Sequence, residues 1–348
     1  MKRATIYDVA RKAGVSHQTV TRYLNGFEGI RPATRERVQA ALVELQYKPN
    51  SAARYLRSQQ TNRIGILAHK MELAGPGRVI AGATSTARAR GYVLDIVSMD
   101  GEDVTSVDAA LDVILDHQIA GVFGTAQTEV VRQALIERAL DVPIAIVGAI
   151  ALEGAENPLG LAGRLAARHL IELGHRRVGF LGGPSAWLAS GERRSGFLQE
   201  ARLHGLDIVW EAEGDWSAAS GFDAAASVMA EDGLTAIACA NDSMAIGMIS
   251  GLAERGLSVP GDISVIGMDD APDSRYVLPA LSTVRLDFEG EGADNMQRLI
   301  AMIEGTESAP HWLHLPPAMI WRDSSRPVGG DLREAHAQPA AHPGDGPA

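Results

Sequence analysis

Apolar positions recur at helical spacing in the first part of the chain, between polar residues that favour helix ends. Thr5 and Asp8 are placed to cap a helix through about Ala13, because short side-chain oxygens accept hydrogen bonds from the free amides of a first turn. After a short turn, Ser16 is placed to cap a second helix that runs to about Asn25. The pattern helix, three-residue turn, helix predicts a helix-turn-helix unit.

A third helix is predicted from Arg31-Pro32, since proline is tolerated at the first helical position. Its apolar stripe has the three-and-four spacing of a buried face and consists of Val38, Ala41, Leu42 and Leu45. Residues 51–57 could form one or two further turns capped by Asn50. A helix this short is marginal alone in water, so we expect it to form only when something packs on it.

From residue 63 onward the pattern changes to short apolar runs separated by amphipathic stretches of helical length. The candidate strands are Ile64–Ala68, Tyr92–Val97, Gly121–Gly124, Ile144–Val147, Arg177–Leu181, Ile208–Trp210, Ala236–Ala240, Ser264–Ile266 and Thr283–Arg285. Such alternation predicts an α/β fold of doubly wound parallel sheets covered by helices on both sides. The length of this part favours two lobes. Residues 329–348 are rich in Pro, Gly, Ala and His without apolar periodicity, which predicts a disordered tail.

Charge is distributed unevenly along the chain. The net charge is −11, yet residues 1–60 hold eleven Lys or Arg and four Asp or Glu, a net of +7, while the other 288 residues carry −18. A basic head on an acidic body raises the expectation of nucleic-acid contact by the head alone. The single cysteine, Cys239, excludes a disulfide framework and fits an inert core residue. We expect a cytoplasmic protein, because neither a membrane span nor a signal peptide is present in the sequence.

The second predicted helix carries side chains suited to reading DNA. In a helix-turn-helix this helix enters the major groove with its first turns toward the base edges. Gln18 can pair with adenine, Arg22 with guanine, and His17 with a base or a phosphate, while Val20 should pack inward. The alternative is a solvated polar helix in a small three-helix module.

Several segments resemble the lactose/galactose repressor (LacI/GalR) family of bacterial transcription regulators over about residues 3–328. They are Thr5–Asn25, Thr34–Val38, Leu45–Asn50, Glu172–Gly183, Ala240–Ala245 and Pro260–Asp270, and the segment Glu213–Phe222 looks closest to lactose-responsive members. The resemblance implies a headpiece at 1–46, a hinge helix and linker at 47–62, and an effector-binding core at 63–328. The core would comprise an N-lobe (63–161 and 289–318) and a C-lobe (162–288 and 319–328), with a periplasmic-binding-protein-like fold.

The resemblance also implies the residues that contact DNA. They are Thr5, Tyr7, Ser16, His17, Gln18, Thr19, Thr21, Arg22, Asn25, Thr34, Tyr47, Asn50, Ala53 and Leu56. Leu56 of each of two subunits would wedge into the minor groove and kink the duplex, although it could also be an ordinary buried linker residue. The partners implied are a pseudo-palindromic operator and a second copy of the chain. The tail offers one leucine followed by a proline, so no tetramer-forming helix is expected.

By the same resemblance, an effector would bind between the lobes. The implied site comprises His69, Leu73, Val79, Thr125, Gly148, Arg193, Trp216, Asn241, Asp269, Leu286 and Phe288. Arg193, Asn241 and Asp269 would hydrogen-bond sugar hydroxyls, although Arg193 could be a surface ion pair, Asp269 a cap, and Trp216 a core residue. The lactose-binding pattern of the family has aspartate, serine, asparagine and glutamine where this chain has Gly148, His69, Thr125 and Leu286. The N-lobe half of the site is therefore rebuilt, and the effector need not be a galactoside.

These observations predict a DNA-binding repressor of a carbohydrate-utilisation operon that a small sugar releases from its operator. No nucleophile elbow or metal-binding His/Cys cluster occurs, so we expect neither an enzyme nor a cofactor. Two alternatives stay open: a regulator that takes a purine-like or other non-sugar co-repressor, and a solute-binding protein for transport. The latter would need a signal peptide and no headpiece.

Overall fold

The computed structural model describes residues 4–24, 27, 29–45, 61–138, 140–148, 157–229, 233–306 and 315–329. It divides into two compact units, Met1–Thr61 and Asn62–Ala348, which are described separately below. Several predicted features lie outside the described residues: the tail from residue 330, Asn25, Tyr47, Asn50, and the hinge with Ala53 and Leu56.

The first unit, the headpiece, contains three helices: α1 (Ile6–Ala13), α2 (His17–Leu24) and α3 (Pro32–Glu44). A reciprocal pair of hydrogen bonds begins α1. The Asp8 amide donates to Thr5 Oγ1 at 3.3 Å, and the Thr5 amide donates to Asp8 Oδ2 at 2.9 Å. Ser16 Oγ accepts from the Thr19 amide at 3.2 Å at the start of α2. The three helices and both caps agree with the sequence prediction.

A small apolar core holds the headpiece together. Val9, Val20 and Val38, one from each helix, are fully buried. Leu42 and Leu45 of the predicted stripe are half-buried against them. Because Val20 faces this core, the other side of α2 is left exposed for contact with a partner.

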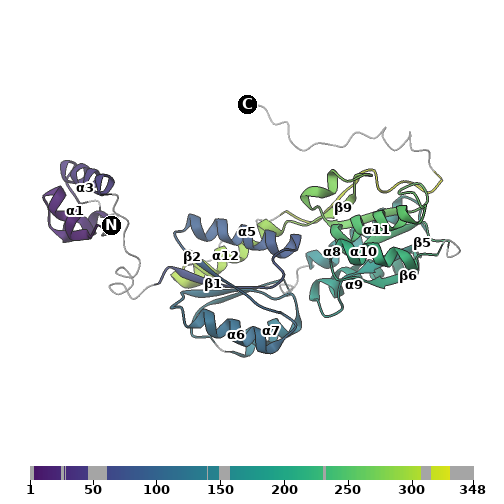
Figure 1. The fold of residues 1–348 in the computed structure, drawn as a ribbon, viewed down its shortest axis with the longest axis horizontal. Coiled ribbons are helices and arrows are strands. Elements are labelled where there is room, and N and C mark those ends of the chain that lie inside the picture. The colour runs from purple at the N-terminus through teal and green to yellow at the C-terminus, as the bar shows by residue number, and fades with distance from the viewer. Residues whose placement is uncertain are drawn as a thin grey trace. The chain divides into compact units, whose positions relative to one another are not determined.

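The second unit begins with a four-stranded sheet, which we call the N-lobe sheet. Its order is β2-β1-β3-β4 and all its strands are parallel. The strands are β1 (Arg63–Ala68), β2 (Val93–Ser98), β3 (Gly121–Thr125) and β4 (Ile144–Val147). Helices α5 (Ala74–Ala89) and α12 (Phe288–Glu304) cover one face, and α6 (Val104–Leu115) and α7 (Glu129–Glu137) cover the other (Figure 1).

The C-lobe sheet has six strands in the order β10-β9-β8-β7-β5-β6. The strands are β5 (Arg177–Gly182), β6 (Asp207–Glu213), β7 (Ala236–Cys239), β8 (Ser264–Asp269), β9 (Ser282–Arg285) and β10 (Ala318–Ile320). Helices α8 (Pro158–Glu172) and α9 (Leu188–His204) lie on one face, and α10 (Ala218–Ala224) and α11 (Asp242–Glu254) on the other. Two short 3-10 helices span Ala225–Ser227 and Pro272–Arg275.

All nine predicted strands are present, with ends shifted by a few residues. The sequence did not predict β10, which is half-buried, only three residues long, and antiparallel to β9. The C-lobe sheet is therefore mixed at one edge rather than wholly parallel.

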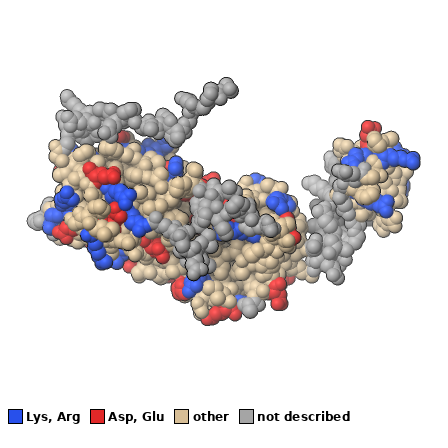
Figure 2. All heavy atoms as spheres, turned by 180° about the vertical axis from the view of Figure 1, so that it is seen from behind, with Lys and Arg blue, Asp and Glu red and all other residues tan. Residues whose placement is uncertain are grey.

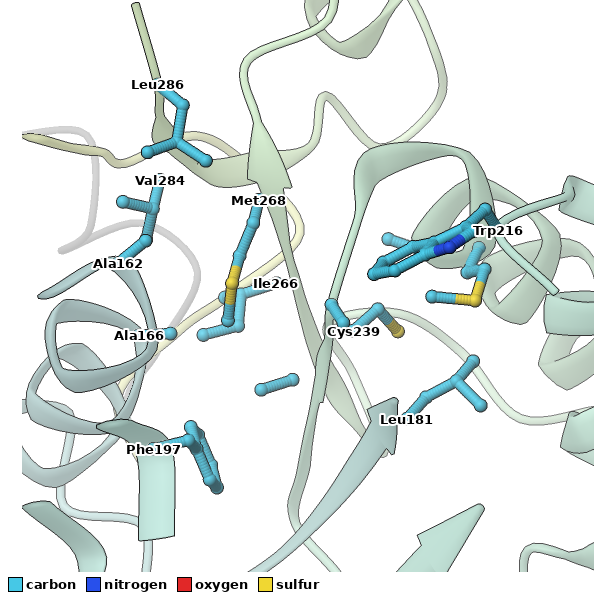
Figure 3. Packing of buried hydrophobic residues seen from close by; sticks show 14 of the residues in the cluster. Ala162, Ala166, Leu181, Phe197, Trp216, Cys239, Ile266, Met268, Val284 and Leu286 are labelled. Atoms are coloured by element: carbon cyan, nitrogen blue, oxygen red, sulfur yellow. The ribbon is translucent and has the colours of Figure 1, made fainter. Parts of the chain in front are cut away.

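The C-lobe interior is packed between these layers, as Figure 3 shows for α8 residues Ala162 and Ala166 facing Ile266 and Met268 of β8. Cys239 is fully buried in this interior, and burial raises the pKa of its thiol, in agreement with an inert core residue. No helix within the described ranges is long and apolar enough to cross a membrane.

Candidate functional site

A pocket lies where the carboxyl ends of the strands of both sheets meet. This is where open α/β sheets bind ligands, since the loops that leave the strands diverge there. Its empty space of about 700 Å³ includes the part that opens to solvent. Nine of the eleven positions in the predicted effector site line it: Leu73, Val79, Thr125, Gly148, Arg193, Trp216, Asn241, Asp269 and Phe288.

A buried ion pair forms the polar end of the pocket. Arg193 Nη2 of α9 donates to Asp269 Oδ1 at 2.9 Å, and both side chains are almost fully buried. Burial raises the pKa of the Asp269 carboxyl, and the Arg193 guanidinium opposes that rise. Arg193 also donates through Nη1 to the carbonyl of Ala240 and lies 5.5 Å from the centroid of the Trp216 ring.

Two pocket residues have unusual backbone conformations. Trp216 has φ +73° and Asp269 has φ +119°, and residues other than glycine rarely adopt positive φ angles. Asn241 holds Trp216 in place, because its Nδ2 donates to the Trp216 carbonyl at 2.9 Å while its Oδ1 caps α11 at the Met244 amide. The Trp216 ring also packs so closely on Gly183 that any Cβ there would lie 2.3 Å from it. Backbone strain held by its surroundings is typical of binding sites.

Three buried polar atoms of pocket residues have no hydrogen-bond partner within the described part of the chain. They are Arg193 Nε, Trp216 Nε1 and Gln127 Oε1. Leaving such atoms unpaired is costly, so bound water or a ligand that offers both acceptors and donors must pair with them in this cavity.

The remaining walls are largely apolar. Leu73 and Val79 come from the start of α5, and Phe288 begins α12, where its ring lies against Gly75. Trp187, directly before α9, adds a second indole that meets the Trp216 ring at an interplanar angle of 62° and a centroid distance of 5.7 Å. Sequence reasoning missed Trp187, because it stands in a loop outside any periodic pattern and outside the family motifs.

Two predicted effector residues lie outside the pocket lining. Leu286 is buried in the C-lobe interior, where Figure 3 shows it beside Val284. His69 is 2% exposed, and its ring lies 5.2 Å from the Trp187 ring. Gly148 is at the pocket with φ +104°, so its backbone conformation itself favours glycine. Thr125 is also there, but its hydroxyl donates to the Leu67 carbonyl at 2.9 Å.

The headpiece presents the expected outer face of α2. Ser16, His17, Gln18 and Arg22 are exposed, while Thr19 and Thr21 are partly covered. At the neighbouring end of α1, exposed Tyr7 stacks on His17 with ring centroids 5.2 Å apart. Thr5 is exposed, and Thr34 is partly covered near the start of α3. Figure 2 shows blue Lys and Arg patches on the visible face of the headpiece.

Chemistry that would indicate a metal enzyme is absent from the described residues, in which no group of three or more His, Cys, Asp or Glu side chains could hold a metal ion. Asp242, beside the pocket at the start of α11, uses its carboxylate in hydrogen bonds within the C-lobe. It accepts hydrogen bonds from Ser274 Oγ at 2.6 Å, from the Ala271 amide at 2.7 Å and from Thr283 Oγ1. Burial and the neighbouring Asp269 raise the pKa of the Asp242 carboxyl.

Comparisons with known proteins agree with both units. Residues 5–50 match the profile described as bacterial regulatory proteins, lacI family, and residues 167–325 match a periplasmic binding protein-like domain. The lactose operon repressor of Escherichia coli (strain K12) is 32% identical over 330 residues, which cover 93% of this chain and 91% of that protein. The HTH-type transcriptional repressor PurR of Erwinia tasmaniensis is 32% identical over 330 residues, which cover 92% and 96%.

Among solved structures, the lac repressor dimer bound to operator and the anti-inducer ONPF is similar, with a TM-score of 0.78 and 29% sequence identity. The match covers 93% of this chain and 100% of that one. These relatives are described as repressors, and none of the three as an enzyme.

Proposed function

The chain belongs to the lacI family of bacterial regulatory proteins and is one of its DNA-binding transcriptional repressors, and we propose that a small carbohydrate bound in the pocket controls its affinity for operator DNA. The regulated genes would then serve the use of that carbohydrate. The names of the relatives do not decide the effector, because one is a lactose operon repressor and another is PurR.

The observation that carries the proposal is the arrangement of aromatic and unpartnered polar groups in the pocket. Two parallel aromatic faces would give a planar purine a ring to stack on at each side. Trp187 and Trp216 instead meet at 62°, which leaves no parallel slot between them. A sugar ring has an apolar C–H face for one indole and hydroxyls that both donate and accept. Those hydroxyls suit Arg193 Nε, Trp216 Nε1 and Gln127 Oε1, the unpartnered atoms of the pocket.

A binding screen tests the effector class. We expect a thermal-shift screen with methyl galactosides, glucosides and xylosides, lactose, cellobiose, hypoxanthine and guanine to raise the melting temperature with at least one sugar. The variant Gln127→Ala removes a side-chain oxygen that has no partner among the described residues, so it should fold normally and bind that sugar several-fold more weakly. Stabilisation by a nucleobase and by no sugar would overturn the proposal in favour of a co-repressor.

On the DNA side, we propose that α2 reads the operator through Gln18 and Arg22, with His17 at a base or phosphate. These side chains are exposed on one helix whose Val20 faces the core. Arg22→Ala should weaken binding to an operator selected from a random pool by about 1–3 kcal/mol, while binding to unrelated duplex changes much less. Equal losses on both duplexes would reduce Arg22 to a phosphate contact.

The active form is proposed to be a homodimer on a pseudo-palindromic operator. The similar lac repressor structure is a dimer, and Tyr276 and Leu278 of this chain expose 75% and 93% of their surface on one C-lobe loop. Large apolar side chains so exposed favour a protein interface. Light scattering should give a dimer mass for the full chain, and Leu278→Asp should shift it toward monomer. A tetramer mass would contradict this assembly.

Release by the sugar follows from linkage. An effector that binds better to the form with lower operator affinity must weaken operator binding, and the operator must in turn weaken effector binding to the same extent. We expect the sugar found in the screen to lower operator affinity in a fluorescence-anisotropy titration. Tighter binding in its presence would make the sugar a co-repressor.

A further inference from the structure

Trp187 is a C-lobe residue whose backbone is attached to the N-lobe. It lies at the N-cap of α9 and pairs with Thr128 as an isolated antiparallel bridge. The next amide along, that of Leu188, donates to the carbonyl of Gln127 at 2.9 Å. Thr128 itself caps α7 of the N-lobe. Two chain segments from different lobes are thus joined at the edge of the pocket.

The Trp187 side chain makes a second set of contacts with the N-lobe. Its Nε1 donates to Glu102 Oε1 at 3.2 Å, and its ring packs on the His69 ring at 5.2 Å with an interplanar angle of 40°. The His69 ring is itself fixed, because its Nδ1 lies 2.9 Å from the Gly101 amide and 3.1 Å from the Met99 carbonyl. Only 5% of Trp187 is exposed.

The same ring reaches the ligand space. Trp187 lines the pocket and meets Trp216, whose own indole N–H has no partner in the described part of the chain. A chain of three rings, His69, Trp187 and Trp216, therefore runs from the N-lobe to the wall of the pocket.

We propose that Trp187 is a ligand-contacting residue that also latches the two lobes together, with Glu102 and His69 acting as positioning residues through it. The identity of the ligand rests on the proposed function, but the latch does not. Its backbone bridge, indole hydrogen bond and ring contact all join segments of different lobes, so any movement that separates these segments must break them. A ligand that packs on the Trp187 ring therefore favours the closed arrangement by its differential affinity for that arrangement.

The ligand-free test measures the distance between the lobes. The chain has one cysteine, Cys239, and it is fully buried, so spin labels can be directed to Ile136→Cys on α7 and Leu203→Cys on α9, both exposed positions. We expect the distance distribution to broaden toward longer distances in Trp187→Ala and, to a lesser degree, in Trp187→Phe. Glu102→Ala should shift it in the same direction from the opposite lobe. A distribution unchanged in all three variants would overturn the latch.

Trp210→Phe is the matched control. Trp210 of β6 is also buried, and its Nε1 donates to Ser227 Oγ at 3.1 Å, so the control loses a comparable indole hydrogen bond outside the pocket. It should leave the distance distribution as in the wild type. If Trp210→Phe broadens the distribution as much as Trp187→Phe does, the effect is general loosening of the fold and the latch is refuted.

The ligand test uses the sugar glycosides of the thermal-shift screen. Trp187→Phe keeps an aromatic face and should bind the stabilising glycoside about 3- to 10-fold more weakly, while Trp187→Ala should lose at least 10-fold. Equal affinity in wild type and Trp187→Ala would show that the ring does not touch the ligand. If no glycoside binds the wild type, the proposed effector class fails, and the distance measurement still decides the latch.

Discussion

Two neighbouring arginines on α9 form ion pairs in very different surroundings. Arg193 pairs with Asp269 at 2.9 Å, and both side chains are about 5% exposed. Arg194 pairs with Glu211 at 2.7 Å, and its side chain is 50% exposed. A buried charge that loses its partner remains desolvated and uncompensated, whereas an exposed one regains water. The two arginines therefore allow the effect of burial on the strength of an arginine–carboxylate ion pair to be tested on one helix.

We expect Asp269→Asn to lower the free energy of unfolding by about 3 kcal/mol or more, because it leaves the Arg193 guanidinium buried without a counter-charge. Glu211→Gln should cost less than about 1 kcal/mol. Urea unfolding followed by circular dichroism measures both. The double variant Arg193→Met/Asp269→Asn should recover part of the loss, and equal costs for the two single variants would contradict this account.

Two buried histidines attach the segment after β10 to the C-lobe. His169 Nε2 lies 3.0 Å from Ser325 Oγ, and His175 Nε2 lies 3.2 Å from the Arg326 carbonyl. Burial lowers the pKa of each ring to about 4, so both are neutral in the folded chain at pH 7.

These histidines predict a loss of stability on acidification. An unfolded histidine, with a pKa near 6.5, takes up a proton before the folded one does. Stability therefore rises with pH between about 4 and 6.5, and it falls as the pH drops through that window. Each ring should contribute a loss of about 2 kcal/mol between pH 7 and pH 5.

The test compares slopes rather than single values. His175→Asn costs stability at pH 7 through its lost contacts, but the further decline to pH 5 should be smaller than in the wild type. Urea unfolding at both pH values gives the change in stability with pH for the wild type and for the variant. The buried Asp242 carboxyl, whose pKa is raised, has the opposite effect on stability, but it is present in both proteins and cancels in the comparison. Parallel slopes would mean that His175 has the same pKa in the folded and the unfolded chain, which would contradict the lowered pKa of its buried ring.

At this scale the sequence predicted residue types better than side-chain directions. The family resemblance implies Arg193, Asn241 and Asp269 as site residues, and all three line the pocket. His69 and Leu286 follow strands in the same way, but their side chains are buried elsewhere. The direction of the His69 side chain depends on packing from the other lobe, where Trp187 lies against its ring, and no local pattern contains that information.

Among the elements, α5 and α12 carry the apolar walls of the pocket and cross at glycine. A Cβ at Gly82 would lie 2.0 Å from the Glu289 carbonyl oxygen, and one at Gly292 would lie 1.9 Å from the Val79 carbonyl oxygen. Both obstacles are backbone, so the helices would have to separate to admit a side chain. Val79 and Phe288, which line the pocket, lie on these two helices.

Gly82→Ala should therefore lower the free energy of unfolding by about 1–3 kcal/mol, because α12 must move away from α5. Gly191→Ala is the control, since Gly191 lies in α9 with nothing within 4 Å of its ideal Cβ. That change should be neutral or stabilise by up to about 1 kcal/mol. Thermal unfolding of both variants measures the difference in stability. An unchanged stability of Gly82→Ala would show that the two helices can accommodate a methyl group at their crossing.

The elements themselves could be predicted well from periodicity. Most parallel strands are short apolar runs between amphipathic helices, and α1 and α2 of the headpiece begin at side-chain caps. The strand β10 could not be predicted, because three half-buried residues carry no period and its pairing partner β9 lies more than thirty residues earlier. Long-range pairing fixes such an edge strand.

For the whole molecule, the uneven charge predicts how it meets DNA. The first 60 residues carry a net charge of +7 and the rest −18. Phosphate attraction should therefore come from the headpiece, while the acidic core is repelled from the duplex. Under the proposed function, an effector bound to the core would then release DNA without touching DNA itself.

Reciprocity of the two binding events gives the decisive whole-molecule prediction. If sugar bound beside Trp187 and Trp216 in both subunits weakens operator binding by some factor, a saturating operator duplex must lower the product of the two sugar-binding constants of the dimer by that same factor. Coupling of about 1–3 kcal/mol, which is typical of allosteric proteins, corresponds to 5- to 150-fold. Isothermal titration of the sugar with and without operator measures the change in sugar affinity, and anisotropy with and without sugar measures the change in operator affinity.

An unrelated duplex is the control and should leave sugar affinity nearly unchanged. Because this reciprocity is a thermodynamic necessity, factors that disagree would mean only that a titration had not reached equilibrium, and the size of the factor is what tests regulation. Equal factors of one would show that the pocket binds sugar without regulating the repressor.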